Sequence, residues 1–144
     1  AGLGLTVHAG EMAGPESVAA ALDALPVTRI GHGVRAVEDQ GLVARLAEES
    51  VTLEVNPGSN LALGLYPDWS SHPVDRLRRA GVTVTLSTDN PPYFHTDLPR
   101  EYAALAEAFA WTPADFTEIN RAALAAAFCD APTRTRLLSQ LDPA

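Results

Sequence analysis

Apolar and polar residues alternate in short stretches of the chain, and a period of two residues predicts β-strands. The clearest case is residues 3–8, where the odd positions are leucine or valine and the even positions are glycine, threonine and histidine. One face of this strand is therefore apolar, and the other face ends at His8. Comparable stretches predict three further strands at residues 27–30, 51–55 and 82–86.

Apolar residues at helical spacing lie between and after these strands. The predicted helices span residues 16–25, 37–49, 72–80, 100–110, 112–128 and 132–141. Pro15 precedes the first helix and Gly81 follows the third, which are favoured places for these residue types. Thr112–Asp115 has the form of a capping box. Asn-Pro-Gly-Ser-Asn at 56–60 predicts a loop.

Strands and helices alternate through the first four units, which predicts an α/β fold with a parallel sheet and right-handed crossovers. Four βα units are half of a (β/α)8 TIM barrel. An open, doubly wound sheet is the alternative. Gly-His-Gly at residues 31–33 lacks the third glycine of a phosphate-binding fingerprint. No sequence motif therefore indicates a nucleotide-binding sheet.

The amino-acid composition limits the kinds of molecule that the protein is expected to bind and the compartment in which it is expected to work. The net charge is −8 with 47% hydrophobic residues, so neither nucleic acid nor an anionic membrane is an expected partner. Cys129 is the single cysteine, which indicates a reducing, cytoplasmic compartment. All ten basic residues are arginine, as expected of a GC-rich bacterial genome. The oligomeric state is left open.

Polar side chains follow each predicted strand. Because the carboxyl ends of parallel strands share one edge of a sheet, these residues are expected to meet there. Imidazole and carboxylate groups suit zinc, which activates water when one position stays open. His8 and Asp89 supply two ligands, and no His-x-His pair completes the set. The residues at this edge are His8, Glu11, His32, Glu54, Asn56, Ser59, Asn60, Asp89 and Asn90.

Each of these residues also has a structural interpretation. Glu11 could stabilise a helix start, Glu54 could pair with an arginine, and Asp89-Asn90-Pro91 is a common turn initiator. His72 and His95 are interpreted as helix-start and loop residues without a role in a site.

Four ordered blocks resemble the adenosine/adenine deaminase family, a group of metal-dependent hydrolases. They are Thr-Val-His-Ala-Gly-Glu (6–11), Arg-Ile-Gly-His-Gly (29–33), Leu-Glu-Val-Asn-Pro-Gly-Ser-Asn (53–60) and Ser-Thr-Asp-Asn-Pro (87–91). Glu101-Tyr102 and Asn120-Arg-Ala-Ala-Leu resemble the tail of that family. The resemblance implies the C-terminal half of a (β/α)8 barrel, a Zn²⁺ cofactor and hydrolysis of the 6-amino group of a purine.

The resemblance also implies residue roles. His8 and Asp89 match zinc ligands, and Glu11 matches the glutamate that protonates the purine ring at N1. His32 matches the histidine that orients the metal-bound hydroxide. Asn90 matches the residue that faces N7, and Gly10 is a further candidate substrate contact. Glu54, Ser59 and Asn60 are weaker candidates.

Adenosine is the expected substrate, with adenine as the alternative. Residues 1–144 are expected to form one domain fragment, the C-terminal half of the barrel, because the chain begins inside a strand and the family's His-x-His strand is absent. The isolated chain is therefore expected to be inactive and poorly stable. A non-catalytic half-barrel that binds a partner is the remaining alternative.

Overall fold

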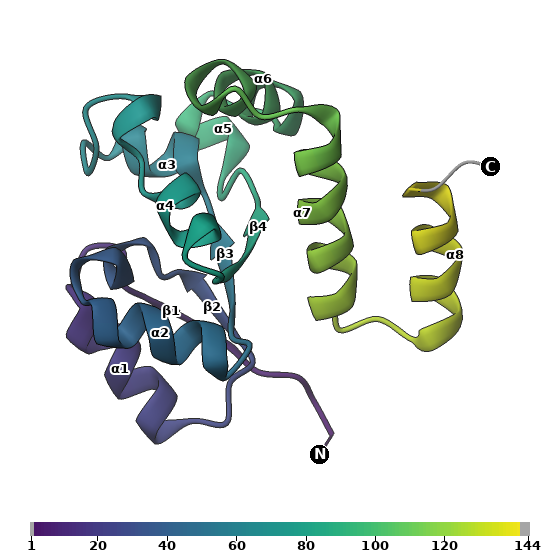
Figure 1. The fold of residues 1–144 in the computed structure, drawn as a ribbon, viewed down its shortest axis with the longest axis horizontal. Helices are drawn as coiled ribbons and strands as arrows, with labels where there is room; N and C mark the ends of the chain where they lie inside the picture. Colours follow the sequence, from purple (N-terminus) through teal and green to yellow (C-terminus); the bar gives the residue numbers. More distant parts are fainter. Residues whose placement is uncertain (1, 142–144) are drawn as a thin grey trace.

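The structure is a computed structural model that describes residues 2–141 (Figure 1). A parallel sheet in the order β1-β2-β3-β4 forms its centre. This sequential order excludes the doubly wound alternative, which needs a reversal of strand order. The fold is thus half of a (β/α)8 barrel. The strands are β1 (Thr6–Ala9), β2 (Arg29–His32), β3 (Thr52–Val55) and β4 (Thr83–Leu86).

The register aligns the carboxyl ends of the strands at one edge of the sheet. Thr6 pairs with Arg29, Arg29 with Thr52, and Thr52 with Thr83. This pairing also explains a difference from the sequence prediction, because the first strand begins at Thr6 and leaves Leu3 81% exposed. Within residues 2–141, β1 has a strand neighbour on one side only.

Helices connect and follow the strands. Between β1 and β4 lie α1 (Pro15–Ala24), the 3-10 turn η1 (Val34–Glu38), α2 (Gln40–Glu48), α3 (Pro57–Ala62), the 3-10 turn η2 (Trp69–Ser71) and α4 (Val74–Arg79). After β4 come α5 (Pro91–Phe94), α6 (Leu98–Phe109), α7 (Pro113–Ala126) and α8 (Ala131–Leu141). Helix α7 runs alongside β4, and α8 folds back beside α7 (Figure 1).

The core lies between the apolar face of the sheet and the helices that cover it. Ile30 and Leu53 of the central strands are fully buried, and Leu46 of α2 and Leu77 of α4 are buried with them. Burying a side chain of this size stabilises a fold by about 1.5–3 kcal/mol. The opposite face of the sheet carries polar side chains, so burial on one face sets which residues face the candidate site.

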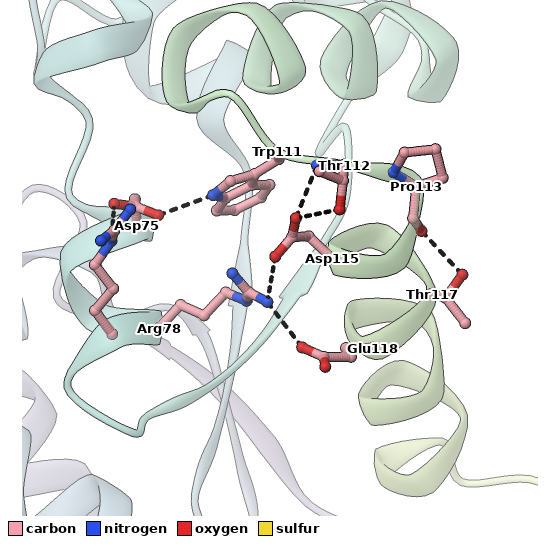
Figure 2. Close-up of polar contacts among 9 residues, drawn as sticks. Asp75, Arg78, Trp111, Thr112, Pro113, Asp115, Thr117 and Glu118 are labelled. Carbon is pink, nitrogen blue, oxygen red and sulfur yellow. Dashed lines mark hydrogen bonds and ion pairs between the residues drawn. The ribbon is translucent and has the colours of Figure 1, made fainter.

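Helix caps follow the sequence signals. Thr112 and Asp115 form the predicted capping box of α7, with Asp115 Oδ2 accepting hydrogen bonds from the Thr112 N–H and Oγ1 at 2.7 Å each (Figure 2). Asp39 and Asp97 cap α2 and α6 by accepting hydrogen bonds from backbone N–H groups. These caps define where the helices begin.

The prediction of a loop at residues 56–60 was wrong. Residues 57–62, within and after the expected loop, form α3. Pro57 suits a first helical position, and the Gly58 N–H donates to the Glu101 carboxylate of α6 at 2.9 Å, so a distant contact outweighs the loop-forming composition. Cys129 lies between α7 and α8 and is half-buried.

No helix formed by residues 2–141 combines the length and the apolar character needed to cross a membrane.

Candidate active site

Three chemically active side chains meet at the carboxyl edge of the sheet. Glu11 follows β1, His32 is the last residue of β2, and Asp89 follows β4. Their potential ligand atoms all lie within 4.8 Å of one another. The residues come from positions far apart in the sequence, so the parallel register is what brings them together.

His8 lies beside this cluster on the exposed face of β1. Its ring contacts the His32 ring edge-on, with 5.1 Å between the ring centroids. His8 and Asp89 also line one cavity of about 330 Å³, together with Gly31, Glu54, Asn56, Thr85 and Ser87. The structure therefore gathers Glu11, His32 and Asp89 in one cluster, with His8 against the ring of His32 and in one cavity with Asp89.

Unusual backbone conformations hold two of these residues. His32 has a φ of 63° and Asp89 a φ of 58°, which is the left-handed region that residues other than glycine rarely adopt. Such conformations cost about 1–3 kcal/mol and are typical of functional sites. These left-handed backbone conformations direct both side chains toward the cluster.

His32 is buried and neutral at neutral pH. Burial lowers the pKa of its imidazole, while the nearby Glu11 carboxylate acts in the opposite direction. His32 Nδ1 lies 3.4 Å from Glu11 Oε1, a geometry that would be an ion pair only with a charged ring. Because burial has the larger effect on the pKa, we interpret this approach as a contact between a neutral imidazole and a carboxyl group.

Asp89 has a defined hydrogen-bond donor. Ser59 Oγ of α3 donates to Asp89 Oδ2 at 2.8 Å. The next residue, Asn90, is the N-cap of α5 but makes no side-chain capping bond. Ser59, one of the weaker site candidates from the sequence, thus restrains the carboxylate of Asp89, one of the stronger candidates.

Glu54 is largely neutralised by its neighbours. Its carboxylate lies 3.0 Å from Arg29 Nε and accepts a hydrogen bond from Thr6 Oγ1 at 2.7 Å. This agrees with the arginine pairing considered from sequence. Although Glu54 lines the cavity, its charge is matched by Arg29, which makes it a weaker metal ligand than Asp89.

Gly10 forms a tight turn after β1. It has a φ of 66°, its N–H donates to Ser17 Oγ at 2.8 Å, and its C=O accepts from the Arg35 N–H at 2.9 Å. Both backbone groups are thus used within the chain, and the turn directs Glu11 toward His32. A substrate contact at Gly10 stays a prediction.

Sequence reasoning missed His72. It was interpreted as a helix-start residue, yet its side chain is buried and its Nε2 lies 3.1 Å from Asn60 Oδ1. Asn60 in turn places its amide nitrogen 3.3 Å from His32 Nδ1. No local pattern around His72 signals this, because the contact depends on how α3 packs against the segment before α4.

Imidazole nitrogen and carboxylate oxygen are ligands that zinc accepts, and His8 and Asp89 bring both to one cavity at the carboxyl edge of the parallel strands. The donor set therefore fits a divalent metal. A half barrel with such a site has the architecture of a metal-dependent hydrolase of the (β/α)8 class.

Comparison with known sequences agrees with this class. Residues 1–144 match the profile of the adenosine deaminase family, and the chain belongs to this family. It is 59% identical over 141 residues to an adenine deaminase of Rhizobium leguminosarum bv. trifolii, covering 98% of this chain and 44% of the relative. An adenine deaminase of Agrobacterium fabrum is 56% identical over 144 residues, covering 100% of this chain and 44% of the relative. The chain therefore spans less than half the length of these curated relatives.

Solved structures show the same fold. The crystal structure of adenine deaminase from Arthrobacter aurescens matches with a TM-score of 0.93 at 29% identity, covering 97% of this chain and 43% of that one. An amidohydrolase from Burkholderia ambifaria with bound Zn matches with a TM-score of 0.84 at 29% identity, covering 99% of this chain and 40% of that one.

Proposed function

We propose that this chain provides one half of the active site of a zinc-dependent purine deaminase. The observation that supports this most directly is the convergence of Glu11, His32 and Asp89 within 4.8 Å, with His8 in the adjoining cavity. Family membership and the zinc-containing structural relative agree with it.

We propose adenine as the substrate. The sequence resemblance favoured adenosine, and the family profile bears that name. However, the relatives with 59% and 56% identity are both named adenine deaminase, as is the solved structure with a TM-score of 0.93. Adenosine is the second candidate, and the two are separated by comparing their turnover.

His8 and Asp89 would hold the metal. His8 lines the same cavity as Asp89, whereas His32 Nδ1 already faces the amide nitrogens of Asn56 and Asn60 at 3.3 Å. A ring nitrogen that accepts an N–H bond cannot also coordinate a metal. When bound, Zn²⁺ would act as a Lewis acid that lowers the pKa of water.

The remaining residues would bind the purine and move protons. Glu11 is half-buried beside the cluster and would donate a proton to the purine ring at N1. His32, held neutral, would orient the attacking group by hydrogen bonding. Asn90 follows Asp89 on the same loop, and its amide can donate to N7 without prior protonation.

We further propose that residues 1–144 are a single domain fragment and that the other ligands lie on a strand ending in His-x-His elsewhere in the full-length protein. The relatives are more than twice as long as the matched region, which supports this. The isolated chain would then be inactive. Measuring the zinc that it binds tests this proposal. Tightly bound, stoichiometric zinc in the 144-residue chain would contradict it.

The direct test is purine turnover by the full-length protein. Glu11→Gln removes general acid catalysis, which typically contributes 10²- to 10⁴-fold to the rate, and Asp89→Ala removes a metal ligand. Glu107→Gln, an exposed position on α6, is the matched control and should keep full activity. Unchanged rates in both site variants would refute the proposal, and faster turnover of adenosine than adenine would refute the substrate assignment.

A further inference from the structure

A buried chain of polar side chains lies behind His32. It runs from His72, just before α4, through Asn60 of α3 to the ring of His32, and Asn56 joins it from the end of β3. His72 is 2% exposed and Asn60 0% exposed. Such buried groups must have their hydrogen bonds satisfied, so the direction of each bond can be worked out.

The direction is set by a backbone donor. The Val74 N–H donates to His72 Nδ1 at 3.2 Å, so this nitrogen carries no proton. Burial lowers the pKa of His72 to about 3, so at neutral pH the ring holds a single proton, on Nε2. A backbone N–H cannot reverse its role, which makes this end of the chain unambiguous.

The direction of the bond from His72 also determines the orientation of the Asn60 amide. His72 Nε2–H faces Asn60 Oδ1 at 3.1 Å, and only the amide oxygen can accept this bond. The Asn60 amide nitrogen is therefore on the other side, where it lies 3.3 Å from His32 Nδ1 and donates to it.

Asn56 also faces the ring of His32, but it does not select between the two ring nitrogens. Its Nδ2 donates to the backbone C=O of Glu54 at 3.1 Å, which identifies that atom as nitrogen. The same Nδ2 lies 3.3 Å from His32 Nδ1 and 3.4 Å from Nε2. Because these two distances are nearly equal, Asn60 is the amide that determines which ring nitrogen of His32 accepts a hydrogen bond.

We propose that His72 and Asn60 are positioning residues that hold His32 as the tautomer with an accepting Nδ1 and a protonated Nε2. The Glu11 carboxyl, 3.4 Å from Nδ1, acts against this by favouring a proton there. It is partly exposed, however, whereas reversing the amides would leave buried polar groups unpaired. The value of this tautomer for catalysis rests on the proposed deaminase function; the tautomer itself does not.

The test is the protonation of each imidazole nitrogen in metal-free, full-length protein with ¹⁵N-labelled histidine at neutral pH. Long-range ¹H–¹⁵N correlation distinguishes a protonated from an unprotonated ring nitrogen. His32 and His72 should both show the Nε2–H tautomer. A His32 ring with its proton on Nδ1 in the unaltered protein would overturn the inference without any variant.

The variant Asn60→Asp tests whether the amide of Asn60 determines the tautomer of His32. A carboxylate still accepts from His72 but cannot donate to His32, so His32 should shift to the Nδ1–H tautomer or become doubly protonated. His95→Gln, at an exposed position away from this chain of bonds, should leave the His32 signals unchanged. A His32 tautomer that is the same in Asn60→Asp as in the unaltered protein would overturn the inference.

Turnover supplies the second readout. His72→Phe should lower kcat by about tenfold or more with little change in KM, and His72→Gln, whose amide can donate to Asn60, should restore most of it. Equal kcat for His72→Phe and the unaltered enzyme would overturn the positioning role. If the tautomer is as expected but no purine is converted, the proposed function fails while the bond direction stands.

Discussion

Ser59 and Asp89 are joined by a hydrogen bond of 2.8 Å from the serine hydroxyl to the carboxylate Oδ2, although 30 residues separate them in sequence. This bond links helix α3 to the loop after β4. It restrains a carboxylate whose backbone is already in the left-handed region. Because α3 was expected to be a loop, the bond could not have been inferred from the sequence.

Replacing Ser59 with alanine should weaken metal binding by the full-length protein about 10- to 100-fold, because outer hydrogen bonds orient metal ligands. Chelator competition measures the zinc affinity. Ser70→Ala removes a serine–aspartate bond of the same length, to Asp68 on the surface, and should leave zinc affinity unchanged. Equal zinc affinities in the two variants would contradict this role of Ser59.

Gly31→Ala should displace His8 from the cavity. A Cβ at this position would overlap Cδ2 of the His8 ring and lie 2.9 Å from Nε2. Since His8 is exposed, its ring can move aside, so we expect weaker zinc binding with unfolding free energy changed by less than about 1 kcal/mol.

Gly41→Ala is the control for that substitution. Gly41 lies in the first turn of α2 and does not line the cavity, and a Cβ there would lie 3.2 Å from Oδ1 of Asp39, the residue that caps the helix. Gly41→Ala should leave zinc affinity unchanged. Retained zinc affinity in Gly31→Ala would show that His8 is not a ligand.

The carboxylate of Glu101 binds the start of α3. Replacing Glu101 with alanine or with glutamine should distinguish the contribution of its hydrogen bonds to stability from the contribution of its charge. Glu101 accepts from the Gly58 N–H at 2.9 Å and from Thr96 Oγ1 at 2.7 Å. Glu101→Ala leaves the Gly58 N–H unpaired and should cost about 1–3 kcal/mol. Glu101→Gln can keep both bonds, because the threonine hydroxyl can reverse and accept from the amide.

The pH dependence gives a second check on Glu101. Burial raises the pKa of its carboxyl above the ordinary 4.5, with the Thr96 and Gly58 bonds acting against this. The folded state therefore holds the proton more tightly, and stability should fall as pH rises through the folded-state pKa. Chemical denaturation at several pH values should show this loss in the unaltered protein but not in Glu101→Gln. An identical pH profile would contradict it.

Asp115 should make the start of α7 sensitive to acid. Bonds from Thr112 and the nearby Arg78 lower the pKa of Asp115 to about 2 from 3.8 (Figure 2). A lowered folded-state pKa stabilises the fold above pH 3.8, and this contribution is lost as pH falls toward 2. Asp115→Ala should therefore lower the Tm at pH 7.

Thermal melts across pH test the Asp115 prediction. The Tm difference between Asp115→Ala and the unaltered protein should shrink between about pH 4 and pH 2. Glu118→Gln also removes a carboxylate that Arg78 contacts at 2.8 Å, but this side chain is 71% exposed, so its effect should be small at every pH. A constant Tm difference for Asp115→Ala would show that the cap does not titrate.

Most of the elements followed from local patterns. The four strands, the capped start of α7 and the final helix lie within a few residues of their predicted bounds, because alternation, helical spacing and capping residues act over short distances. The parallel sheet also followed, since alternating strands and helices leave few other connections. The order of the strands was left open and needed the structure.

The site was predicted in part. The polar residues at the strand ends, including His8, Glu11, His32 and Asp89, could be identified because parallel strands share a carboxyl edge. The bond from His72 through Asn60 to His32 could not, since each partner is placed by the packing of a different element.

The sequence by itself determined which residues alternate, where helices begin, and which side chains can bind a metal or move a proton, because these properties depend on residue type and near neighbours. Only the tertiary structure decided the helical form of α3, the left-handed backbone of His32 and Asp89, and the direction of the buried hydrogen bonds. These features arise from contacts between residues distant in sequence, and no local preference specifies such contacts.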